Sequence, residues 1–240
     1  IKTIHLKNLI IASTSTIHGE KYLNYLKEEL YTHFSNISEL LFIPYARPGG
    51  ISHDKYTAIA NEFFNTIGVK VKGIHEFNTP KDAIKNAEGI FTGGGNTFVL
   101  VKQLYHFDIL SLLKQVILNG TPYLGSSAGS NICGLTAHTT NDMPIVLPKS
   151  LKTLGLVPFN INPHYLDPDP NSKHMGETRE TRIKEFMNYN PQPVVGLREG
   201  SWIKVNGDDM VLGGQLNARV FASPNEISEV APGYNFRDLK

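Results

Sequence analysis

The first half of the chain alternates short apolar runs with segments in which apolar residues recur at helical spacing. The apolar runs predict strands at residues 9–12, 40–45, 69–74, 89–92 and 122–124. Helical spacing predicts helices at residues 20–34, 53–67, 80–87, 97–105 and 109–118, and a further helix that begins at residue 128. Strands that alternate with helices in this order are typical of a parallel sheet with helices on both faces. We therefore expect an α/β fold with a central, mostly parallel sheet.

The second half of the chain follows a different pattern. Short strand-like segments occur around residue 161 and at residues 194–195, 202–205, 210–212 and 219–221, and polar or glycine-rich turns separate them. Only residues 177–189 have the length and spacing of a substantial helix. We expect these strands to extend the main sheet or to form a small additional β layer on it. No linker, internal repeat or low-complexity segment interrupts residues 1–240, which predicts a single domain.

Composition and charge narrow the class of protein. Hydrophobic residues make up 40% of the chain and charged residues 19%, as in globular proteins. The 23 basic and 22 acidic residues leave a formal net charge of +1, which argues against binding to nucleic acid or to a membrane surface. No apolar run approaches the roughly 18 residues of a membrane span. Lysines interrupt the N-terminal apolar stretch, unlike a signal peptide. A single cysteine, Cys133, excludes an internal disulfide and a cysteine-based zinc site. We expect a cytoplasmic protein.

Small residues surround two serines where a predicted strand meets a predicted helix. The sequence there is Gly-Ser-Ser-Ala-Gly, at residues 125–129. Serine hydrolases with a parallel sheet hold their nucleophile in such a turn, and its tight backbone needs small residues two positions before and after the serine. Around Ser127 both positions are glycine, whereas around Ser126 one of them is Leu124, which is too large. The turn predicts Ser127 as a nucleophile, and an ordinary βα turn is the alternative.

Three glycines at residues 93–95, followed by Asn96, connect another predicted strand to a helix. Glycines allow the backbone to present N–H groups to a ligand without obstruction by side chains. With the amides of Gly95 and Ala128 as donors, the loop predicts an oxyanion hole. A plain tight turn and a phosphate-binding loop are the alternatives. The loop has neither the Lys-Ser/Thr pair of a P-loop nor the spacing of a dinucleotide site, which makes phosphate binding the weaker of these.

A serine nucleophile needs an adjacent base, most often a histidine. Of the nine histidines, His164 follows the apolar stretch 157–161, at a strand end beside the expected active-site edge. A structural histidine is the alternative. Two carboxylates are candidates to orient its imidazole: Asp142, in a polar turn, and Glu199, between two strand-like segments. Either could instead be a solvated turn residue, and sequence spacing does not decide between them.

Arg179 and Arg182 lie on the predicted helix 177–189 together with three glutamates. A surface helix with ion pairs between residues three and four positions apart is one interpretation. In the other, one arginine faces a pocket and holds a substrate carboxylate in a bidentate pair.

With these residues in view, the chain resembles the S51 (peptidase E) family of serine peptidases, which are α-aspartyl dipeptidases. The resemblance extends through nearly the whole chain. It rests on Phe-Ile-Pro-Tyr at 42–45, Gly-Gly-Gly-Asn-Thr-Phe at 93–98, Gly-Ser-Ser-Ala-Gly-Ser-Asn at 125–131, Thr-Thr-Asn-Asp-Met-Pro-Ile-Val at 139–146, Ile-Asn-Pro-His at 161–164, Gly-Glu-Thr-Arg-Glu at 176–180, Glu-Gly-Ser-Trp-Ile at 199–203 and Val-Leu-Gly-Gly at 211–214. It implies an α/β fold similar to that of class I glutamine amidotransferases.

Carried over by position, the resemblance also implies the members of a site. They are Ser127 as nucleophile, His164 as general base, Asp142 as orienting carboxylate, Glu199 as a rival or supporting acid, Gly95 and Ala128 as oxyanion hole, and Arg179 and Asn96 as substrate-binding residues. The implied reaction hydrolyses the bond after an N-terminal aspartate in a dipeptide through an acyl-enzyme, without a metal or cofactor. The expected partner is a small peptide, and a homodimer is a possible assembly.

Two features depart from the family pattern. Ser126 stands where we expect a large aromatic residue, and the loop after His164 is longer and carries Asp167 and Asp169. Two other functions remain open, a cyanophycinase-like peptidase acting on β-aspartyl-arginine and a catalytically inactive binding protein of the same fold. An amidotransferase is disfavoured because Cys133 lies six residues beyond the nucleophile position.

Overall fold

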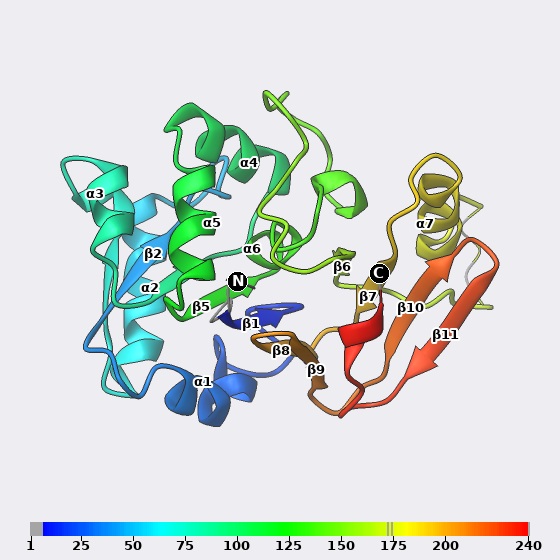
Figure 1. Cartoon of the computed structure of the whole chain (residues 1–240), viewed down its shortest axis with the longest axis horizontal. Coiled ribbons are helices and arrows are strands. Elements are labelled where there is room, and N and C mark those ends of the chain that lie inside the picture. Colours follow the sequence, from blue (N-terminus) through cyan, green and yellow to red (C-terminus); the bar gives the residue numbers. More distant parts are fainter. Residues whose placement is uncertain (1–6, 172, 174, 240) are drawn as a thin grey trace, which may run out of the picture.

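Two sheets form the centre of the computed structural model, which describes residues 7–171, 173 and 175–239. The larger sheet has seven strands in the order β3-β2-β4-β5-β1-β8-β9, and the smaller has four in the order β11-β10-β7-β6 (Figure 1). The strands are β1 (Asn8–Ala12), β2 (Glu39–Ile43), β3 (Lys70–Gly73), β4 (Ile90–Thr92), β5 (Tyr123–Ser126), β6 (Asn160–Pro163), β7 (Val194–Leu197), β8 (Trp202–Asn206), β9 (Asp209–Gly213), β10 (Ala218–Ser223) and β11 (Glu226–Val230).

The larger sheet is mostly parallel, as the alternating pattern predicts. Five strands run parallel to one another, in the order β3-β2-β4-β5-β1. Strands β8 and β9 form a hairpin, and β8 pairs antiparallel with β1. The helices are α1 (Lys27–His33), α2 (His53–Asn65), α3 (Pro80–Lys85), α4 (Thr97–His106), α5 (Leu110–Leu118), α6 (Ala128–Asn131) and α7 (Arg179–Met187).

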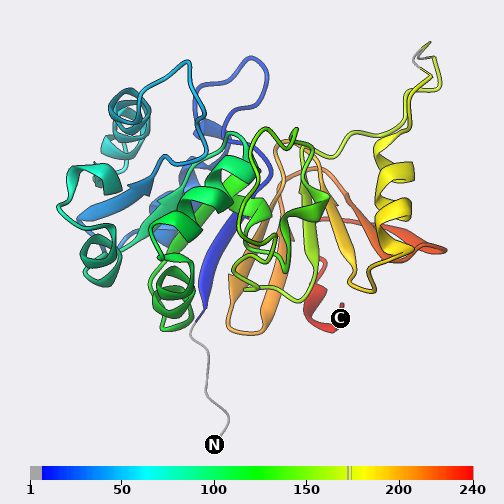
Figure 2. The same ribbon diagram turned by 90° about the horizontal axis from the view of Figure 1, so that it is seen from above.

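Helices cover both faces of this sheet (Figure 2). Strand β1 illustrates why, since its side chains alternate between two buried clusters. Leu9 and Ile11 pack on the face covered by α3, α4 and α5, whereas Ile10 and Ala12 pack on the face covered by α1 and α2. A strand that is buried on both faces has a continuous run of apolar residues. The sequence predicts β1 from such a run.

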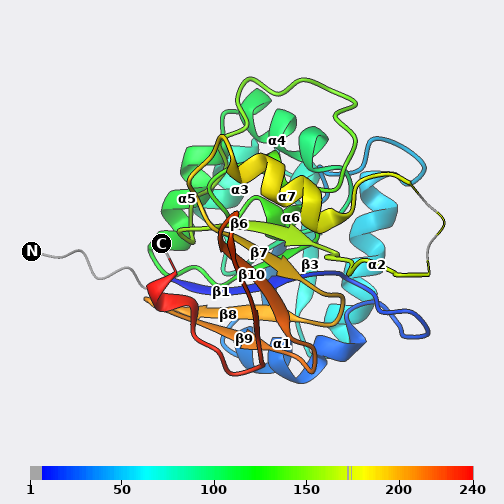
Figure 3. The same cartoon turned by 90° about the vertical axis from the view of Figure 1, so that its right-hand side faces the viewer.

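The smaller sheet is the additional β layer expected for the second half. Its face toward the main sheet contributes Val195 and Val220 to the same core cluster as Leu9. Its other face packs against α7, where Val194 and Phe221 contact the helix cluster (Figure 3). Strand β11 was not predicted from the sequence. Only its last residue is buried, so the strand has no run of apolar residues.

Helix boundaries follow local capping in most places. Ser52, Thr79 and Asn96 each accept a hydrogen bond from the backbone at the start of α2, α3 and α4. The predicted helix 20–34 is wrong at its beginning, because Leu23 adopts a left-handed conformation with φ of 55° and α1 begins only after a short 3₁₀ turn. In the described part of the chain, no helix has the length and hydrophobicity to cross a membrane.

Candidate active site

Ser127, His164 and Glu199 meet where strands of the two sheets end. Ser127 follows β5 of the larger sheet, whereas His164 follows β6 and Glu199 lies shortly after β7 of the smaller sheet. Strands β6 and β7 are parallel, so their carboxyl ends lie at the same edge. This edge is where α/β sheets commonly bind ligands.

The turn around Ser127 has the strained geometry that its sequence predicts. Ser127 has φ of 53° and ψ of −110°, an unusual conformation for a residue with a side chain. A Cβ atom at Gly125 would overlap the carbonyl of Gly129, and one at Gly129 would overlap the carbonyl of Thr92. Glycine is therefore required on both sides. The turn leaves Ser127 partly exposed, whereas Ser126 is fully buried.

The hydroxyl of Ser127 lies within hydrogen-bond distance of an imidazole. Its Oγ is 2.9 Å from Nε2 of His164. The other ring nitrogen, Nδ1, is 2.7 Å from Oε1 of Glu199. With the proton on Nδ1, the ring donates to Glu199 and leaves Nε2 free to accept from Ser127. This order of contacts is that of a nucleophile, a base and an orienting acid.

Asp142, the orienting carboxylate that the resemblance implies, has other partners in the structure. Its Oδ2 accepts hydrogen bonds from the amide of Thr97, at 2.7 Å, and from the hydroxyl of Thr140, at 2.9 Å. Asp142 thus lies at the N-terminus of α4, where the helix dipole favours a negative charge. Asp142 bonds to the start of α4 rather than to the imidazole, and Glu199 occupies the place beside His164.

Two further residues position His164, and sequence reasoning did not single them out. The hydroxyl of Ser13, which is buried at the end of β1, accepts from the amide of His164 at 2.9 Å and donates to the carbonyl of Leu197 at 2.7 Å. The side-chain Nδ2 of Asn141 donates to the backbone carbonyl of Pro163 at 2.8 Å. For Ser13, the available signal was a polar residue directly after a buried strand.

The glycine loop after β4 lies against Ser127. A Cβ built on Gly94 would be 3.0 Å from the Cβ of Ser127. Gly95 has φ of 145°, and a Cβ there would overlap the carbonyl of Ala46. Within residues 7–171, 173 and 175–239, no acceptor is recorded for the amides of Gly94, Gly95 or Ala128. Amides without an acceptor beside a nucleophile can bind an oxyanion.

Asn96, expected to bind substrate, forms hydrogen bonds within the protein through both polar atoms of its side chain. Its Oδ1 accepts from the amide of Val99 at 3.1 Å and caps α4, while its Nδ2 donates to the carbonyl of Met143 at 2.9 Å. These bonds give Asn96 a structural role where the glycine loop ends and α4 begins.

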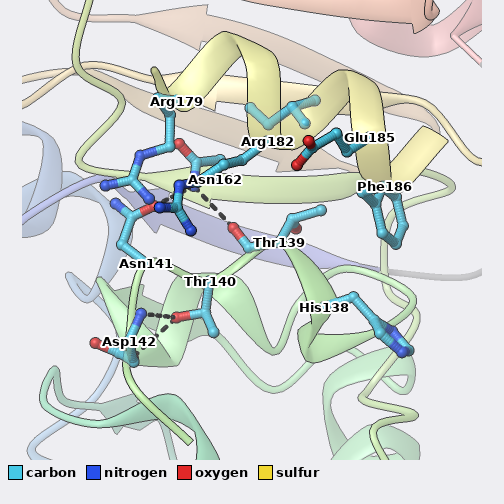
Figure 4. A pocket seen from close by; sticks show the side chains of 11 residues that line it. His138, Thr139, Thr140, Asn141, Asp142, Asn162, Arg179, Arg182, Glu185 and Phe186 are labelled. Carbon is cyan, nitrogen blue, oxygen red and sulfur yellow. Dashed lines mark hydrogen bonds between the residues drawn. The ribbon is translucent and has the colours of Figure 1, made fainter. Parts of the chain in front are cut away.

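A pocket of about 260 Å³ is lined by Asp142 and Asn162 and contains both arginines of α7 (Figure 4). Arg179 and Arg182 extend from the helix toward Asn141 and Asn162, which lie on the opposite wall. Partial burial, and to a smaller extent the positive charge of Arg182, lower the pKa of Arg179. Nε of Arg179 and Oδ1 of Asn162 are buried without a hydrogen-bond partner in the part of the chain that the structure describes. Arg179 therefore offers a donor to a ligand in this pocket, and Asn162 offers an acceptor.

The acidic loop after His164 does not place two free carboxylates in this pocket. Asp167 forms a bidentate pair with Arg198, with N–O distances of 2.6 and 2.7 Å, and this pair lowers the pKa of Asp167. Oδ1 of Asp169 accepts from the amide of Asn171 at 2.8 Å. Both aspartates line a neighbouring pocket of about 510 Å³ that also contains the two arginines.

Cys133 is fully buried, and burial raises the pKa of its thiol. A buried neutral thiol is a poor nucleophile, which agrees with the sequence argument against an amidotransferase. Among the described residues, no group of three or more His, Cys, Asp or Glu side chains is arranged to hold a metal ion.

Comparisons with known proteins identify the relatives of this chain. Residues 9–213 match the model of Peptidase family S51. The chain is 44% identical over 229 residues to a probable alpha-aspartyl dipeptidase of Drosophila melanogaster, covering 94% of each chain. It is 45% identical over 232 residues to Peptidase E of Streptomyces coelicolor, covering 97% of this chain and 94% of the relative.

Solved structures show the same fold at lower sequence identity. A putative peptidase E protein from Listeria monocytogenes superposes with a TM-score of 0.64 at 21% identity, over 87% of this chain and 98% of its own. A peptidase from an acI-B1 Actinobacterium superposes with a TM-score of 0.67 at 16% identity, over 97% of both chains.

Proposed function

The chain belongs to Peptidase family S51, and from this membership we propose that it cleaves dipeptides after an N-terminal aspartate, with Ser127 as the nucleophile. The family match and the near full-length relatives make the chain a serine-type dipeptidase. The preference for aspartate and the role of each residue are the proposal.

One observation carries the proposal, the line of contacts from Ser127 through His164 to Glu199. Oγ of Ser127 attacks the peptide carbonyl, and Nε2 of His164 takes its proton. The carbonyl oxygen becomes negative and is stabilised by the amides of Gly95 and Ala128. The C–N bond then breaks, and the leaving amine receives the proton from Nε2. Water repeats these steps on the acyl-enzyme and releases aspartate. Glu199 keeps the imidazole in the required tautomer and stabilises its charged form.

The preference for aspartate rests on Arg179. A guanidinium group matches a carboxylate with two parallel hydrogen bonds, and such pairs are stronger than neutral ones. Arg179 shares its pocket with Asn162 of β6, which precedes His164 by two residues. We expect a side-chain carboxylate bound there to place the adjacent peptide bond near Ser127. The names of the two relatives described above support the same substrate class.

The test compares Ser127→Ala with Ser126→Ala. We expect S127A to lower kcat on Asp-Leu by about 10⁴-fold or more. S126A removes a buried hydroxyl that has no partner among the described residues, so its kcat should remain near that of the wild type. An S127A protein with wild-type activity would refute the assignment. Cleavage of β-Asp-Arg in preference to α-Asp-Arg would instead favour a cyanophycinase-like activity.

A further inference from the structure

Arg182 shares its pocket with the arginine to which the substrate carboxylate is assigned. It follows Arg179 by three residues on α7, and residues at this spacing lie on the same face of a helix. Both side chains line the 260 Å³ pocket, and both line the adjacent 510 Å³ pocket. Figure 4 shows the two side chains extending in the same direction, toward Asn141 and Asn162.

Three carboxylates near this helix bond to residues other than Arg179 and Arg182. Glu180 lies between the two arginines in sequence, but it accepts from Lys184 at 2.7 Å and from Arg219 at 2.9 Å. Asp167 is held by Arg198, and Asp142 by Thr97. Glu185 lines the smaller pocket and Glu177 the larger one. Within the described ranges, however, no salt bridge joins either of them, or any other carboxylate, to Arg179 or Arg182.

Two adjacent cations without a counter-ion repel each other, and partial burial of one of them strengthens the repulsion. Arg182 is one of the groups that lower the pKa of Arg179, which reflects this repulsion. An anion placed between the two guanidinium groups would replace repulsion with two attractions. Nε of Arg179, which is buried and unpartnered among the residues described, would gain an acceptor.

We infer that Arg182 is a second specificity residue, and that the side-chain carboxylate of the N-terminal substrate residue binds between Arg179 and Arg182. This inference rests on the proposed function and refines its substrate site. Arg179, the more buried of the two, fixes the position of the carboxylate. Arg182, which is more exposed, contacts it from the solvent side. The positive charges of the two arginines thus favour a substrate whose N-terminal residue has an anionic side chain.

The test measures kcat/KM of Arg182→Gln on Asp-Leu and on its neutral analogue Asn-Leu. We expect kcat/KM for Asp-Leu to fall by about tenfold or more, mainly through KM, because a charged contact is lost. The value for Asn-Leu should stay nearly constant, so that the Asp/Asn ratio collapses. Arg182→Lys keeps the charge but not the planar fork, and it should give an intermediate ratio.

Arg237→Gln is the matched control, since it makes the same change at an exposed arginine paired with Asp209 and outside both pockets. It should leave the ratio unchanged. An R182Q protein with the wild-type Asp/Asn ratio would overturn the inference while the dipeptidase activity stands. A wild-type protein that does not cleave Asp-Leu would overturn the proposed function and this inference with it. Because Arg182 is exposed, folding of the variants can be verified by their unchanged Tm.

Discussion

Glu199 places Oε1 2.7 Å from Nδ1 of His164, on the ring nitrogen that does not face Ser127. Its side chain is 50% exposed, and that of His164 is 36% exposed. A pair this exposed contributes little to stability. We therefore expect its effect to fall on the orientation and tautomer of the imidazole, and so on the reaction.

Glu199→Gln should consequently lower kcat on Asp-Leu by about 10³- to 10⁴-fold, as other losses of an orienting acid do. The Tm should change very little. Asp142→Asn is the contrast, because it weakens the bond to the Thr97 amide and removes a negative charge from the start of α4. It should lower the free energy of unfolding by about 1 kcal/mol. Steady-state kinetics and thermal melts of both variants separate the two roles, and wild-type kcat in E199Q would contradict the assignment.

Ser13→Ala should impair catalysis without touching the nucleophile or the base. The variant leaves the amide of His164 buried without its acceptor and breaks the link to Leu197. Leaving a buried donor unsatisfied costs about 1 to 3 kcal/mol of stability. Because the backbone of His164 then loses its anchor, we expect kcat to fall while KM changes less. Denaturant melts and kinetics on Asp-Leu test this, and an unchanged kcat would show that the bridge does not position the imidazole.

Gly129→Ala should destabilise the fold, because the new Cβ would overlap the carbonyl of Thr92. A steric conflict with backbone atoms cannot be relieved by a rotamer change, so we expect a loss of about 2 to 4 kcal/mol in the free energy of unfolding. Gly49→Ala is the matched control, since its Cβ would meet nothing within 4 Å. It should change stability by less than about 0.5 kcal/mol. Urea titrations of both variants provide the measurement.

The local steric requirement of the nucleophile turn explains why it could be predicted from the sequence. The clash that demands glycine at position 125 arises from Gly129, which is only four residues away. The choice between Asp142 and Glu199 is different, because both lie in segments between other elements and only the arrangement of the two sheets brings one of them to His164. The role of Ser13 has the same origin, since its partners lie more than 150 positions away along the chain.

Strand β11 and helix α1 were predicted less completely for a related reason. Strand β11 is largely exposed and offers little periodic hydrophobic signal. Helix α1 is shorter than its spacing suggests, because Leu23 and Leu26 are buried in a segment that is not α-helical. Pairing with β10 forms the exposed strand, and burial of the two leucines overrides the helical spacing.

His33 should make stability depend on pH. Burial lowers the pKa of His33 to about 4 from an ordinary value of 6.5, although the hydrogen bond to the Tyr123 carbonyl acts in the opposite direction. Between these values the unfolded chain binds a proton that the folded protein does not. The contribution is therefore complete above about pH 6.5 and is lost as the pH falls toward 4.

His33→Gln retains a donor for that carbonyl but removes the titration. Since His33 remains partly accessible, we expect the wild type to lose about 1 to 2 kcal/mol more stability than the variant between about pH 7.5 and about pH 5. Chemical denaturation at the two pH values measures the difference, and parallel losses in both proteins would contradict it.

The two sheets carry different parts of the proposed reaction centre. Ser127 and the glycine loop extend from the seven-stranded sheet, whereas His164, Glu199 and the arginine helix belong to the four-stranded sheet and its α7 cover. The proposed nucleophile and the proposed specificity residues therefore lie on different parts of the fold. Replacing α7 and the loop before it should therefore change the substrate preference without altering the strained turn that holds Ser127.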